Sequence, residues 1–552
     1  MDRQDYQSII YCGFYTIGTP YAKVMGEFLQ PTLDKYNLPY DIQGVKDLGS
    51  WSKNTSYKGK FILDMLEKHK KTLVILDADA TIEQYPTLFS QIPQEYDMAV
   101  HYLDWCYDEK TEILTDQGWK LFKDLDKTEK VATLNPKTEQ LEYYKPTRYI
   151  QYHYKGIMYH FNNKSVDLLV TPNHNIYYKD ERGNKNTKIA QNMYHNQRFN
   201  LLKTCKWYGE NSNFFLLPSY FNCYGNKGNL KYYKSPVKIP IKLWTEFLAW
   251  YLAEGWAGKG MVSIGQDSKS PYIREINSII KKLCKYLKCN YNIYKYKGKV
   301  DNFVICSTQL VDYLSQFGKA KDKYIPIYIK KASSQIINLF IETYIKGDGT
   351  ISKNKGKSIF TASKKMANDI EELILKIGKS SILYNKKSGF GSNIYHIIIK
   401  NRNEASIRRQ YKQKCEYNSK VYCIQVKNHI IYARRNGKPC WSGNCKFWRN
   451  KEGDKSRMEL LSGTMLFRYN PKVIKLMEKY IQRCIDKPSM TEQMNLQKVL
   501  ETGIDIKVYR LPVTYCAIEK KSGRVPEYIK EPKIVHHQIS RKLKNRQNWD
   551  KS

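Results

Sequence analysis

Two short stretches, far apart in the chain, constrain its fold more than any other feature. Cys106 follows Trp105, and Asn444 immediately precedes Cys445. The thiol of Cys106 can attack the carbonyl before it, Cys445 can take over the resulting thioester, and the Asn444 side chain can close on its own carbonyl. In this order the three steps would remove residues 106–444 and join the flanks. A fold that supports such chemistry must bring the two ends of this segment together.

The segment between these stretches is far more basic than its flanks. The whole chain has a formal charge of +39. Residues 106–444 contain 58 Lys and Arg against 27 Asp and Glu, whereas the flanks contain 34 against 26. AT-rich codons can enrich a protein in Lys, but such a bias would act on both parts alike. The excess therefore indicates a polyanionic partner for the inner segment, most often nucleic acid.

Length and cysteine usage narrow the class of protein. A chain of 552 residues is too long for one ordinary core, so two to four domains are expected. Its 13 Cys include no CxxC pair, which argues against a disulfide framework or a zinc knuckle. The start of the chain is charged and lacks an apolar signal core, and no apolar run is long enough to span a membrane. We therefore expect a cytoplasmic protein without a membrane span.

The first flank has the pattern of an α/β fold. A strand is expected over Ile9–Phe14 and helices over Tyr21–Tyr36 and Phe61–Lys70. The continuous apolar run Leu73–Leu76 is typical of a strand buried on both faces, and it ends in Asp77-Ala78-Asp79. Both carboxylates would lie at one strand tip, where such a pair can hold a divalent cation. A solvated strand end is the alternative.

The two flanks together resemble a known enzyme family. The motifs that carry the resemblance are Tyr11–Phe14, Thr19-Pro20-Tyr21, Gly49-Ser50-Trp51, Lys58, Asp77-Ala78-Asp79, Tyr85-Pro86, Ser462–Phe467 and His536–Arg541. They are similar to nucleotide-diphospho-sugar glycosyltransferases of the Rossmann-like GT-A fold.

The resemblance implies a transferase split into residues 1–105 and 445–552, with an unknown acceptor. It would use Mn²⁺ or Mg²⁺ and a nucleotide-diphospho-sugar, which Lys58 would help to bind. The metal ligands would be Asp77, Asp79 and one of two adjacent histidines, His536 and His537. Because the inner segment separates these ligands along the chain, we expect the uncut chain to lack transferase activity.

The two ends of the inner segment have an all-β pattern. Short alternating runs with turns fill residues 106–235, and two further strands are expected within 401–444. Four features together resemble an intein with a horseshoe-like, all-β Hint splicing domain. They are Cys106 through Trp119, the Thr171-x-x-His174 box, the Val421–Tyr432 strand pair and the ending from Asn436 to Asn444-Cys445.

The resemblance assigns a role to each residue of the splicing reaction. Cys106 and Cys445 are the two nucleophiles, and Asn444 closes to a succinimide. His174 would protonate the nitrogen of the first bond, and Thr171 would help to hold the oxyanion. Splicing requires no cofactor.

Two positions depart from the commonest intein pattern. Gly443 stands where many inteins carry a His that assists the closure of the Asn. His429 is a candidate substitute, and a structural His is the alternative. Cys423 stands where many inteins have an Asp, and it could tune Cys445 or the first step. Class 3 inteins also have a Cys there, but they lack the nucleophile that Cys106 supplies.

A strongly basic stretch inside the segment contains a repeated helix pattern. Residues 231–400 hold 30 basic against 12 acidic residues. Helices expected over Leu243–Ala253 and Ile336–Lys346 each lead into a carboxylate and a Gly, with Glu254 and Asp348 as the acids. A carboxylate at a helix C-terminus is repelled by the helix dipole, which a bound metal would offset. Two such cases suggest an internal duplication.

These two helices resemble the dodecapeptide motifs of LAGLIDADG (DOD-type) homing endonucleases, over residues 236–400. The resemblance implies an α/β domain in which Glu254 and Asp348 bind Mg²⁺ to hydrolyse both strands of double-stranded DNA. Lys323 matches the Lys between the motifs, and basic, Tyr-rich strands such as Tyr291–Lys299 would contact the DNA. Ala249 and Thr343 replace the usual Gly of the helix interface.

The sequence thus predicts a multidomain chain in which an intein with an endonuclease interrupts a glycosyltransferase. One alternative is a permanent fusion of a nuclease with a transferase that never splices. The other is a decayed endonuclease that binds DNA without cutting it.

Overall fold

The computed structural model divides the chain into two compact units. It describes residues 9–102, 105–224, 230–296, 299–352, 356–387, 393–444, 460–519, 522–526, 529, 531–539 and 543. The first unit combines Met1–Asp104 with Phe447–Ser552, and the second is Trp105–Lys446. Both boundaries between the units lie beside the two stretches with which the sequence analysis began. Over the described ranges, no helix is long and apolar enough to cross a membrane.

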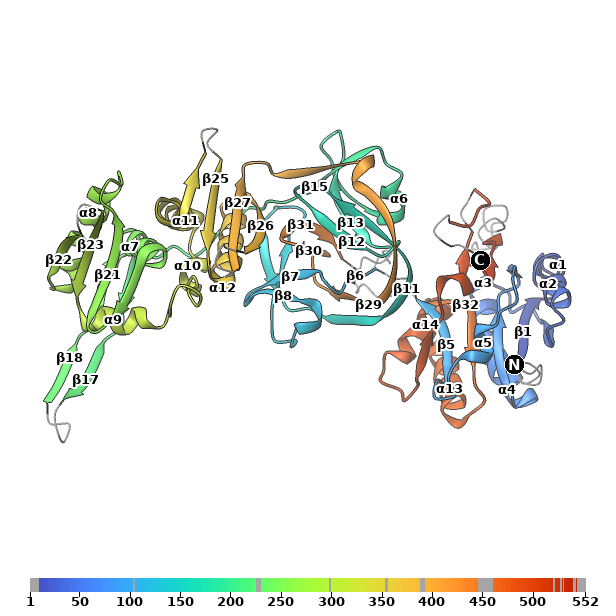
Figure 1. Cartoon of the computed structure of the whole chain (residues 1–552). Helices are drawn as coiled ribbons and strands as arrows, with labels where there is room; N and C mark the ends of the chain where they lie inside the picture. The colour runs from blue at the N-terminus through green and yellow to red at the C-terminus, as the bar shows by residue number, and fades with distance from the viewer. Residues whose placement is uncertain are drawn as a thin grey trace. The chain divides into compact units, whose positions relative to one another are not determined.

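The first unit is built around one sheet to which both flanks contribute. Its strands are β1 (Ile9–Thr16), β2 (Tyr40–Val45), β3 (Thr72–Leu76), β5 (Met98–Tyr102), β32 (Leu460–Phe467) and β33 (Val508–Arg510). The order is β2-β1-β3-β32-β5-β33, with β32 antiparallel to both of its neighbours and the other pairs parallel. A strand of the second flank therefore lies between two strands of the first (Figure 1).

Seven helices are described in this unit, and one expectation about them is wrong. They are α1 (Tyr21–Glu27), α2 (Leu29–Lys35), α3 (Trp51–Ser56), α4 (Lys58–His69), α5 (Leu88–Gln91), α13 (Pro471–Asp486) and α14 (Glu492–Leu500). The single helix expected over Tyr21–Tyr36 is two helices that meet at Phe28. Pro31 explains the break, because it has no N–H to donate to Glu27 and its ring crowds that carbonyl.

A second, smaller sheet of this unit also joins the flanks. It consists of β4 (Ala80–Ile82), β34 (Ala517–Ile518) and β35 (Ile534–His536), in the order β34-β35-β4. β35 pairs antiparallel with β4, so that His536 lies opposite Ala80. This pairing brings the histidine motif of the second flank beside the acidic strand tip of the first.

The second unit begins and ends in β-structure. Its strands before the basic stretch are β6 (Tyr107–Asp108), β7 (Glu112–Thr115), β8 (Gly118–Leu121), β9 (Val131–Leu134), β10 (Leu141–Tyr144), β11 (Arg148–Asn162), β12 (Asp167–Val170), β13 (Asn175–Lys179), β14 (Lys185–Ile189) and β15 (Arg198–Leu202). Those after it are β28 (Glu404–Arg408), β29 (Lys412–Gln425), β30 (Ile430–Arg435) and β31 (Lys438–Gly443). The one α-helix described between β6 and β15 is short, α6 (Ala190–Tyr194).

These strands form three sheets, each of which mixes the two ends of the segment. One is a closed barrel in the order β11-β12-β6-β29, and β11 pairs with β29 from Arg148↔Gln425 to Phe161↔Lys412. The second has the order β10-β9-β30-β7-β8 with β31 on β30, and the third has the order β14-β13-β15-β28. The all-β expectation for both ends of the segment therefore agrees with the structure.

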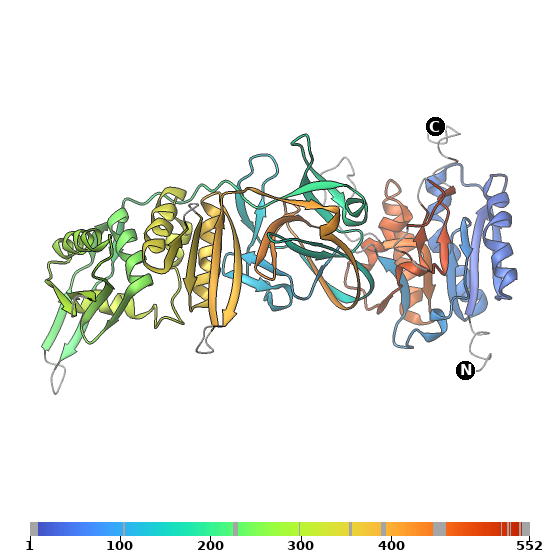
Figure 2. The same cartoon turned by 45° about the horizontal axis from the view of Figure 1, so that its top comes forward.

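Between these ends lie two copies of one arrangement. The first copy is α7 (Ile241–Glu254), β20 (Gly255–Gly258), β21 (Met261–Asp267), α8 (Ile273–Leu287), β22 (Tyr291–Tyr296) and β23 (Val300–Cys306). The second is α11 (Ser334–Asp348), β24 (Gly349–Ile351), β25 (Lys357–Thr361), α12 (Lys364–Lys376), β26 (Ser380–Lys387) and β27 (Asn393–Lys400). The sheet orders, β20-β21-β23-β22 and β24-β25-β27-β26, are the same (Figure 1, Figure 2). The internal duplication expected from the two helices is therefore present in the fold.

Short elements connect the copies to the rest of the unit. They are β16 (Phe214–Leu217), β17 (Tyr220–Tyr224), β18 (Leu230–Lys234), β19 (Val237–Pro240), α9 (Thr308–Ser315) and α10 (Ile327–Lys331). β16 pairs with β19, and β17 pairs with β18 as a separate hairpin.

Helix α12 belongs to two cores at once. Ile370, Leu373 and Ile374 lie in the large apolar cluster that α7 and α11 share. Leu375 lies in the cluster formed by the β-structure around Trp441. The second copy is therefore packed, through this helix, against the β-part, meaning the three sheets formed by residues 107–202 and 404–443. Opposite faces of the helix are both buried.

Candidate functional site

The two-residue strand β6 brings the start of the inner segment into the barrel. Tyr107 pairs with Val170 of β12 on one side and with Tyr422 of β29 on the other. Because β12 runs directly into Thr171, this pairing places Cys106 beside that residue. Cys106 and Thr171 are both almost completely buried.

Thr171 contacts the backbone at the bond that the first step would break. The amide nitrogen of Cys106 donates to Thr171 Oγ1 at 2.8 Å. The amide nitrogen of Thr171 donates to the Cys106 carbonyl at 3.0 Å, and the Thr171 hydroxyl lies 3.4 Å from the same oxygen. The predicted role of Thr171 is to help hold the oxyanion. These contacts place its hydroxyl at the nitrogen of the Trp105–Cys106 bond.

The same few residues also hold the end of the segment. The Tyr107 hydroxyl donates to the Gly443 carbonyl at 2.7 Å, which links the strand after the first nucleophile to the residue before Asn444. His174 Nε2 lies 3.1 Å from Ser442 Oγ, and the ring packs edge-on against Tyr107 with centroids 4.4 Å apart. Residues 106 and 443 are thus positioned by one set of side chains.

His174 is completely buried, and its environment keeps it neutral. Burial lowers the pKa of His174 to about 3, against a smaller opposing effect of the Trp105 and Gly443 backbone groups. A neutral imidazole is a base rather than a ready acid near neutral pH. It must first take up a proton before it can protonate the nitrogen of Cys106.

Asn444 is buried between two elements of the β-part. Its amide nitrogen donates to the carbonyl of His429 at 2.8 Å. Its side-chain Oδ1 lies 3.1 Å from Cys423 Sγ. His429, the predicted substitute for a penultimate His, thus holds Asn444 through its backbone. Cys445, the predicted second nucleophile, lies outside the described residues.

Steric crowding explains why the residue before Asn444 is a glycine. A Cβ built on Gly443 would lie 2.2 Å from the carbonyl oxygen of Asn175. Backbone cannot give way by the distance that such a contact requires. A His at position 443 is therefore incompatible with the packing of β31 against β13.

The duplicated helices bring the two predicted acids to one place. Glu254 is the last residue of α7 and Asp348 the last of α11, and each is followed by a Gly. A Cβ on Gly347 would lie 2.7 Å from the Cβ of Ala253, so the helix ends are in direct contact. Ala249 and Thr343, which replace the usual glycines, are buried in this interface.

Lys323 lies at the same helix ends. Its Nζ donates to the carbonyls of Tyr251, Leu252 and Gly255, at 3.1, 3.0 and 2.9 Å. It therefore places a positive charge at the C-terminus of α7, where the helix dipole is negative. Burial lowers the pKa of Lys323 to about 8, against the opposing charges of Asp348 and Glu254.

Burial disfavours the charged forms of the two acids, and a bound cation would stabilise those forms. Burial raises the pKa of Asp348 to about 6, and the charge of Glu254 adds to the effect, while a hydrogen bond from Tyr344 at 3.0 Å opposes it. Burial also raises the pKa of Glu254. Half-buried carboxylates that repel each other fit a divalent cation bound between them.

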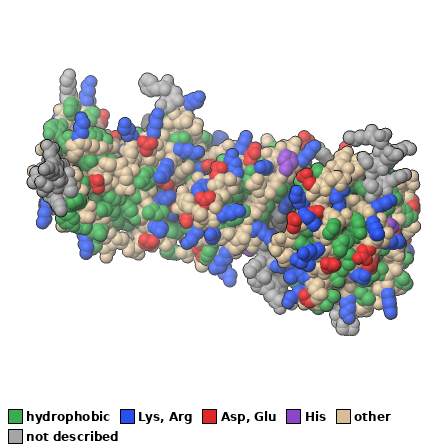
Figure 3. Space-filling model, turned by 90° about the horizontal axis from the view of Figure 1, so that it is seen from below, with side chains coloured by type: hydrophobic (Ala, Val, Ile, Leu, Met, Phe, Trp, Pro, Cys, Tyr) green, Lys and Arg blue, Asp and Glu red, His purple; other side chains and the backbone are tan. Residues whose placement is uncertain are grey.

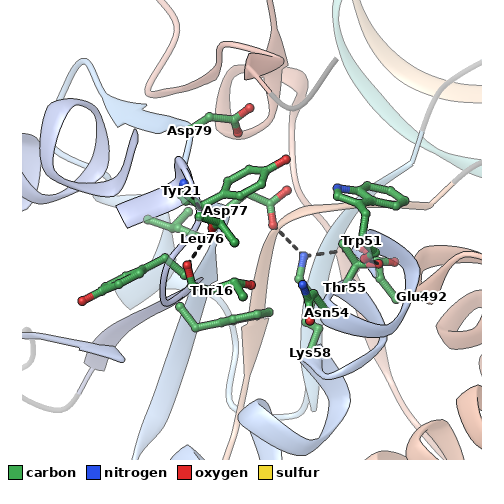
Figure 4. Close-up of a pocket in the computed structure, with 14 residues that line it drawn as sticks. Thr16, Tyr21, Trp51, Asn54, Thr55, Lys58, Leu76, Asp77, Asp79 and Glu492 are labelled. Carbon is green, nitrogen blue, oxygen red and sulfur yellow. Dashed lines mark hydrogen bonds and ion pairs between the residues drawn. The ribbon is translucent and has the colours of Figure 1, made fainter. Parts of the chain in front are cut away.

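The first unit contains a separate pocket at the tip of β3 (Figure 4). Lys58 Nζ, almost completely buried, lies 2.6 Å from Asp77 Oδ1 and 3.6 Å from Glu492 Oε1. Burial would lower the pKa of Lys58, but these two carboxylates outweigh it and raise it, so the side chain is charged. The aromatic rings of Tyr21 and Trp51 line the same pocket.

Three potential metal ligands converge beside this pocket. Ligand atoms of Asp77, Asp79 and His536 all lie within 4.8 Å of one another. Burial lowers the pKa of His536, so the ring is neutral as a metal ligand must be. Its Nε2 bonds Thr464 at 2.8 Å, whereas its Nδ1 is a buried atom without a partner among the described residues. This donor set fits a divalent cation.

Of the two candidate histidines, His537 lies outside this set. Its Nε2 lies 2.8 Å from Thr81 Oγ1 and its Nδ1 lies 3.3 Å from Glu519. The uncut chain already assembles Asp77, Asp79 and His536, because β35 pairs with β4. Separation along the sequence therefore does not separate these ligands in space, which removes the reason given for an inactive uncut chain.

Several residues of these sites were missed by the sequence analysis. They are Tyr107 and Ser442 at the ends of the inner segment, Tyr344 beside Asp348, and Glu492 and Thr464 in the first unit. Only the first two adjoin predicted site residues in the sequence. Tyr344 lies one helical turn before Asp348 on α11, whereas Glu492 and Thr464 lie near their partners only in the folded chain.

Comparison with known proteins supports one part of this description. Residues 335–411 match the family model described as a LAGLIDADG-like domain. The chain is 29% identical over 407 residues to a DNA-directed RNA polymerase subunit beta C-terminal section from Stigeoclonium helveticum, covering 62% of this chain and 36% of the relative. It is 26% identical over 316 residues to an ATP-dependent Clp protease proteolytic subunit from Chlamydomonas moewusii, covering 53% and 30%. The chain thus spans about a third of the length of these curated relatives.

Solved structures show weaker likenesses. I-DmoI in complex with DNA and Mn is 16% identical with a TM-score of 0.24, covering 29% of this chain and 90% of that chain. A splice-inactive variant of the AceL NrdHF class 3 split intein is 18% identical with a TM-score of 0.15, covering 25% and 72%. TM-scores this low do not establish a common fold for the chain as a whole.

The neutral state of His174 predicts a specific sensitivity to acid. The unfolded chain binds a proton at this histidine below about pH 6.5, whereas the folded chain does not until about pH 3. Stability is therefore fully present above pH 6.5 and is lost as the pH falls, by about 2 kcal/mol at pH 5. We expect His174→Gln, in a Cys106→Ala, Asn444→Ala chain, to remove this part of the acid sensitivity. Urea unfolding between pH 7 and 5 measures it, and equal pH slopes for the two chains would contradict it.

Proposed function

We propose that residues 106–444 excise themselves from the chain and join the flanks. The observation that carries this proposal is the shared set of side chains around Cys106 and Gly443. Tyr107 contacts the Gly443 carbonyl, and His174 lies against both Tyr107 and Ser442. A reaction that breaks one bond at each end of the segment and joins the flanks requires the two ends to be held at one place. These contacts would hold them there.

The buried contacts around Cys106 support a specific first step. The Cys106 thiol attacks the Trp105 carbonyl, the carbon–nitrogen bond breaks, and the nitrogen of Cys106 becomes an amine. The thiol must lose a proton and the nitrogen must gain one. A neutral His174 can accept the first and supply the second, so that its own charge is unchanged at the end. Thr171, in contact with that nitrogen, holds it in place as the bond breaks.

The later steps use the end of the segment. The thiol of Cys445 takes the acyl group from Cys106, and the Asn444 side chain then closes on its own carbonyl to release the joined flanks. A reducing cytoplasm is the proposed setting, because both thiols must stay free. No cofactor takes part.

The curated relatives are consistent with an inserted segment. A polymerase subunit and a protease subunit have unrelated activities, yet both match this chain. The matched share for the first is 62% of the chain, close to the share that 339 residues make of 552. A segment that moves between unrelated genes would produce this pattern.

Within this segment we propose a DNA endonuclease of the LAGLIDADG type. Glu254 and Asp348, at the touching ends of α7 and α11, would hold Mg²⁺, which would stabilise negative charge at the phosphate during hydrolysis. The family model that covers residues 335–411 and the raised pKa values of both acids support this site. Lys323 would support the site by holding the C-terminus of α7, because its Nζ donates to three backbone carbonyls there.

Double-stranded DNA is the proposed partner of this domain. Residues 231–400 hold 30 basic against 12 acidic residues, and on the face of the whole chain seen in Figure 3 Lys and Arg side chains are spread widely, with fewer acidic ones among them. The exposed aromatic residues Tyr294, Tyr296 and Trp256 lie on the first of the duplicated sheets. Positive charge gives affinity for phosphates, and exposed side chains on a sheet can reach base edges in a groove.

For the joined flanks we propose a metal-dependent glycosyltransferase that uses a nucleotide-diphospho-sugar. Asp77, Asp79 and His536 would hold Mn²⁺ or Mg²⁺, which would neutralise the diphosphate as it leaves. Lys58 is charged and borders the same pocket, and the rings of Tyr21 and Trp51 offer surfaces for a base. The sugar and the acceptor are left open.

Self-excision predicts two products in place of one. Expression under reducing conditions should give a 339-residue segment and a joined chain of 213 residues, which intact-mass spectrometry would identify. Cys106→Ala with Asn444→Ala should give one 552-residue chain, because both bonds then stay intact. Cys440→Ala, at a buried thiol outside the site, is the control and should splice normally. A single uncut product from the unchanged sequence would favour a permanent fusion.

The proposed nuclease predicts that cleavage and splicing separate. Glu254→Gln or Asp348→Asn should lower cleavage of the gene that lacks the insert by more than about a hundredfold, because the metal loses a charged ligand. Both variants should splice normally. Glu342→Gln, a half-buried acid on α11, is the control. Gel assays with Mg²⁺ measure cleavage. DNA binding without any cleavage by the unchanged protein would favour the decayed form.

The metal site of the flanks predicts binding before any splicing. A Cys106→Ala, Asn444→Ala chain that also carries Glu254→Gln and Asp348→Asn should bind one Mn²⁺ in calorimetry, because its three ligands are already together. Asp79→Asn should weaken this binding by about tenfold to a hundredfold. Asp505→Asn, at an exposed carboxylate of the same unit, should leave it unchanged. Equal affinity in the Asp79 variant would contradict the site.

A further inference from the structure

The thiol of Cys423 lies against the side chain of the residue that ends the inner segment. Cys423 Sγ is 3.1 Å from Asn444 Oδ1, within hydrogen-bonding distance for sulfur. Both residues are almost completely buried, with exposed fractions of 1% and 0%. Cys423 lies on β29, whose neighbouring residue Tyr422 pairs with Tyr107. The contact is therefore built on the same barrel that positions Cys106.

Position 443, where many inteins carry an assisting His, and the candidate substitute His429 meet Asn444 differently from Cys423. Position 443 has no room for a side chain, because its Cβ would collide with the carbonyl of Asn175. His429 holds the amide nitrogen of Asn444 through its carbonyl oxygen. The Cys423 side chain lies at hydrogen-bonding distance from the Asn444 amide oxygen.

We propose that Cys423 is a positioning residue for ring closure at Asn444, with its thiol donating a hydrogen bond to Oδ1. This inference rests on the proposed self-excision, and it assigns Cys423 to the last step. The hydrogen bond fixes the rotation of the side-chain amide, which is buried. It also withdraws electron density through the amide oxygen, which makes the attached nitrogen easier to deprotonate.

The bonds and protons that change during ring closure show at which point the hydrogen bond from Cys423 would help. A bond forms between Asn444 Nδ2 and the main-chain carbon of Asn444, and the bond from that carbon to the nitrogen of Cys445 breaks. One proton leaves Nδ2, and one proton reaches the departing amine. As Nδ2 loses its proton, negative charge develops on Oδ1, and hydrogen bonds to charged groups are stronger than those between neutral groups. Cys423 keeps its proton throughout.

The chemistry of position 423 favours a neutral donor. A carboxylate there would face the partly negative Oδ1 and would be buried without a compensating charge, at a high cost in free energy. A thiol is a weak donor that is readily buried. Serine preserves the donor, whereas alanine removes it and leaves the backbone of β29 intact.

The two ends of the reaction can be measured separately in the full chain. In a Cys106→Ala background the first step is blocked, and release of the second flank reports ring closure at Asn444. In an Asn444→Ala background ring closure is blocked, and cleavage by dithiothreitol at Cys106 reports the first step. Cys423→Ala and Cys423→Ser are compared in both backgrounds, with Cys440→Ala, another buried thiol, as the matched control.

We expect Cys423→Ala to slow release of the second flank by roughly tenfold to a hundredfold, and Cys423→Ser to restore most of the rate. Dithiothreitol cleavage at Cys106 should change less than about twofold in Cys423→Ala, which a general loss of structure would not allow. Release at an unchanged rate, or an equal loss in both assays, would overturn the proposal. If a chain with Cys106, Cys423 and Asn444 intact neither splices nor releases a flank, self-excision itself fails.

Discussion

The position of one two-residue strand determines the geometry at both ends of the inner segment. β6 is too short to be held by its own contacts, and it depends on β12 and β29 at its two edges. That placement sets Cys106 against Thr171 and sends the Tyr107 hydroxyl to Gly443. The long pairing of β11 with β29 in turn keeps the barrel closed. The chemistry at the ends thus depends on strands drawn from distant parts of the segment.

A buried charge network ties the duplicated part to this β-structure. Arg434 of β30, only 2% exposed as a side chain, forms ion pairs with Glu112 of β7 and Glu371 of α12. Removing one member of such a network leaves a buried charge uncompensated, which commonly costs 3–5 kcal/mol. Together with Leu375, which lies in the apolar cluster around Trp441, the network makes α12 a structural part of the β-structure formed by the two ends of the segment. The duplicated part is therefore more than an insertion in a loop, since one of its helices fills part of that core.

Local sequence patterns predicted helices and strands, but they did not predict which residues far apart in the sequence contact each other. The buried run before Asp77 forms a strand, and the two helices that end in Glu254 and Asp348 proved to be copies within a repeated sheet order. The break at Phe28 followed from Pro31, a local signal that helical periodicity obscured. By contrast, the steric need for Gly443 arises from Asn175 in another strand. The choice of His536 over His537 arises from the pairing of β35 with β4, which no single-sequence pattern specifies.

The insertion point in the first unit has a physical logic. Tyr102, at the end of β5, lies opposite Leu460, at the start of β32, in an antiparallel pair. The described part of the first flank therefore leaves this sheet beside the point where the described part of the second flank enters it. The interleaved order β3-β32-β5 adds that neither flank can complete its sheet alone, because each would expose unpaired strand edges. The two flanks therefore hold each other in register across this sheet in the uncut chain.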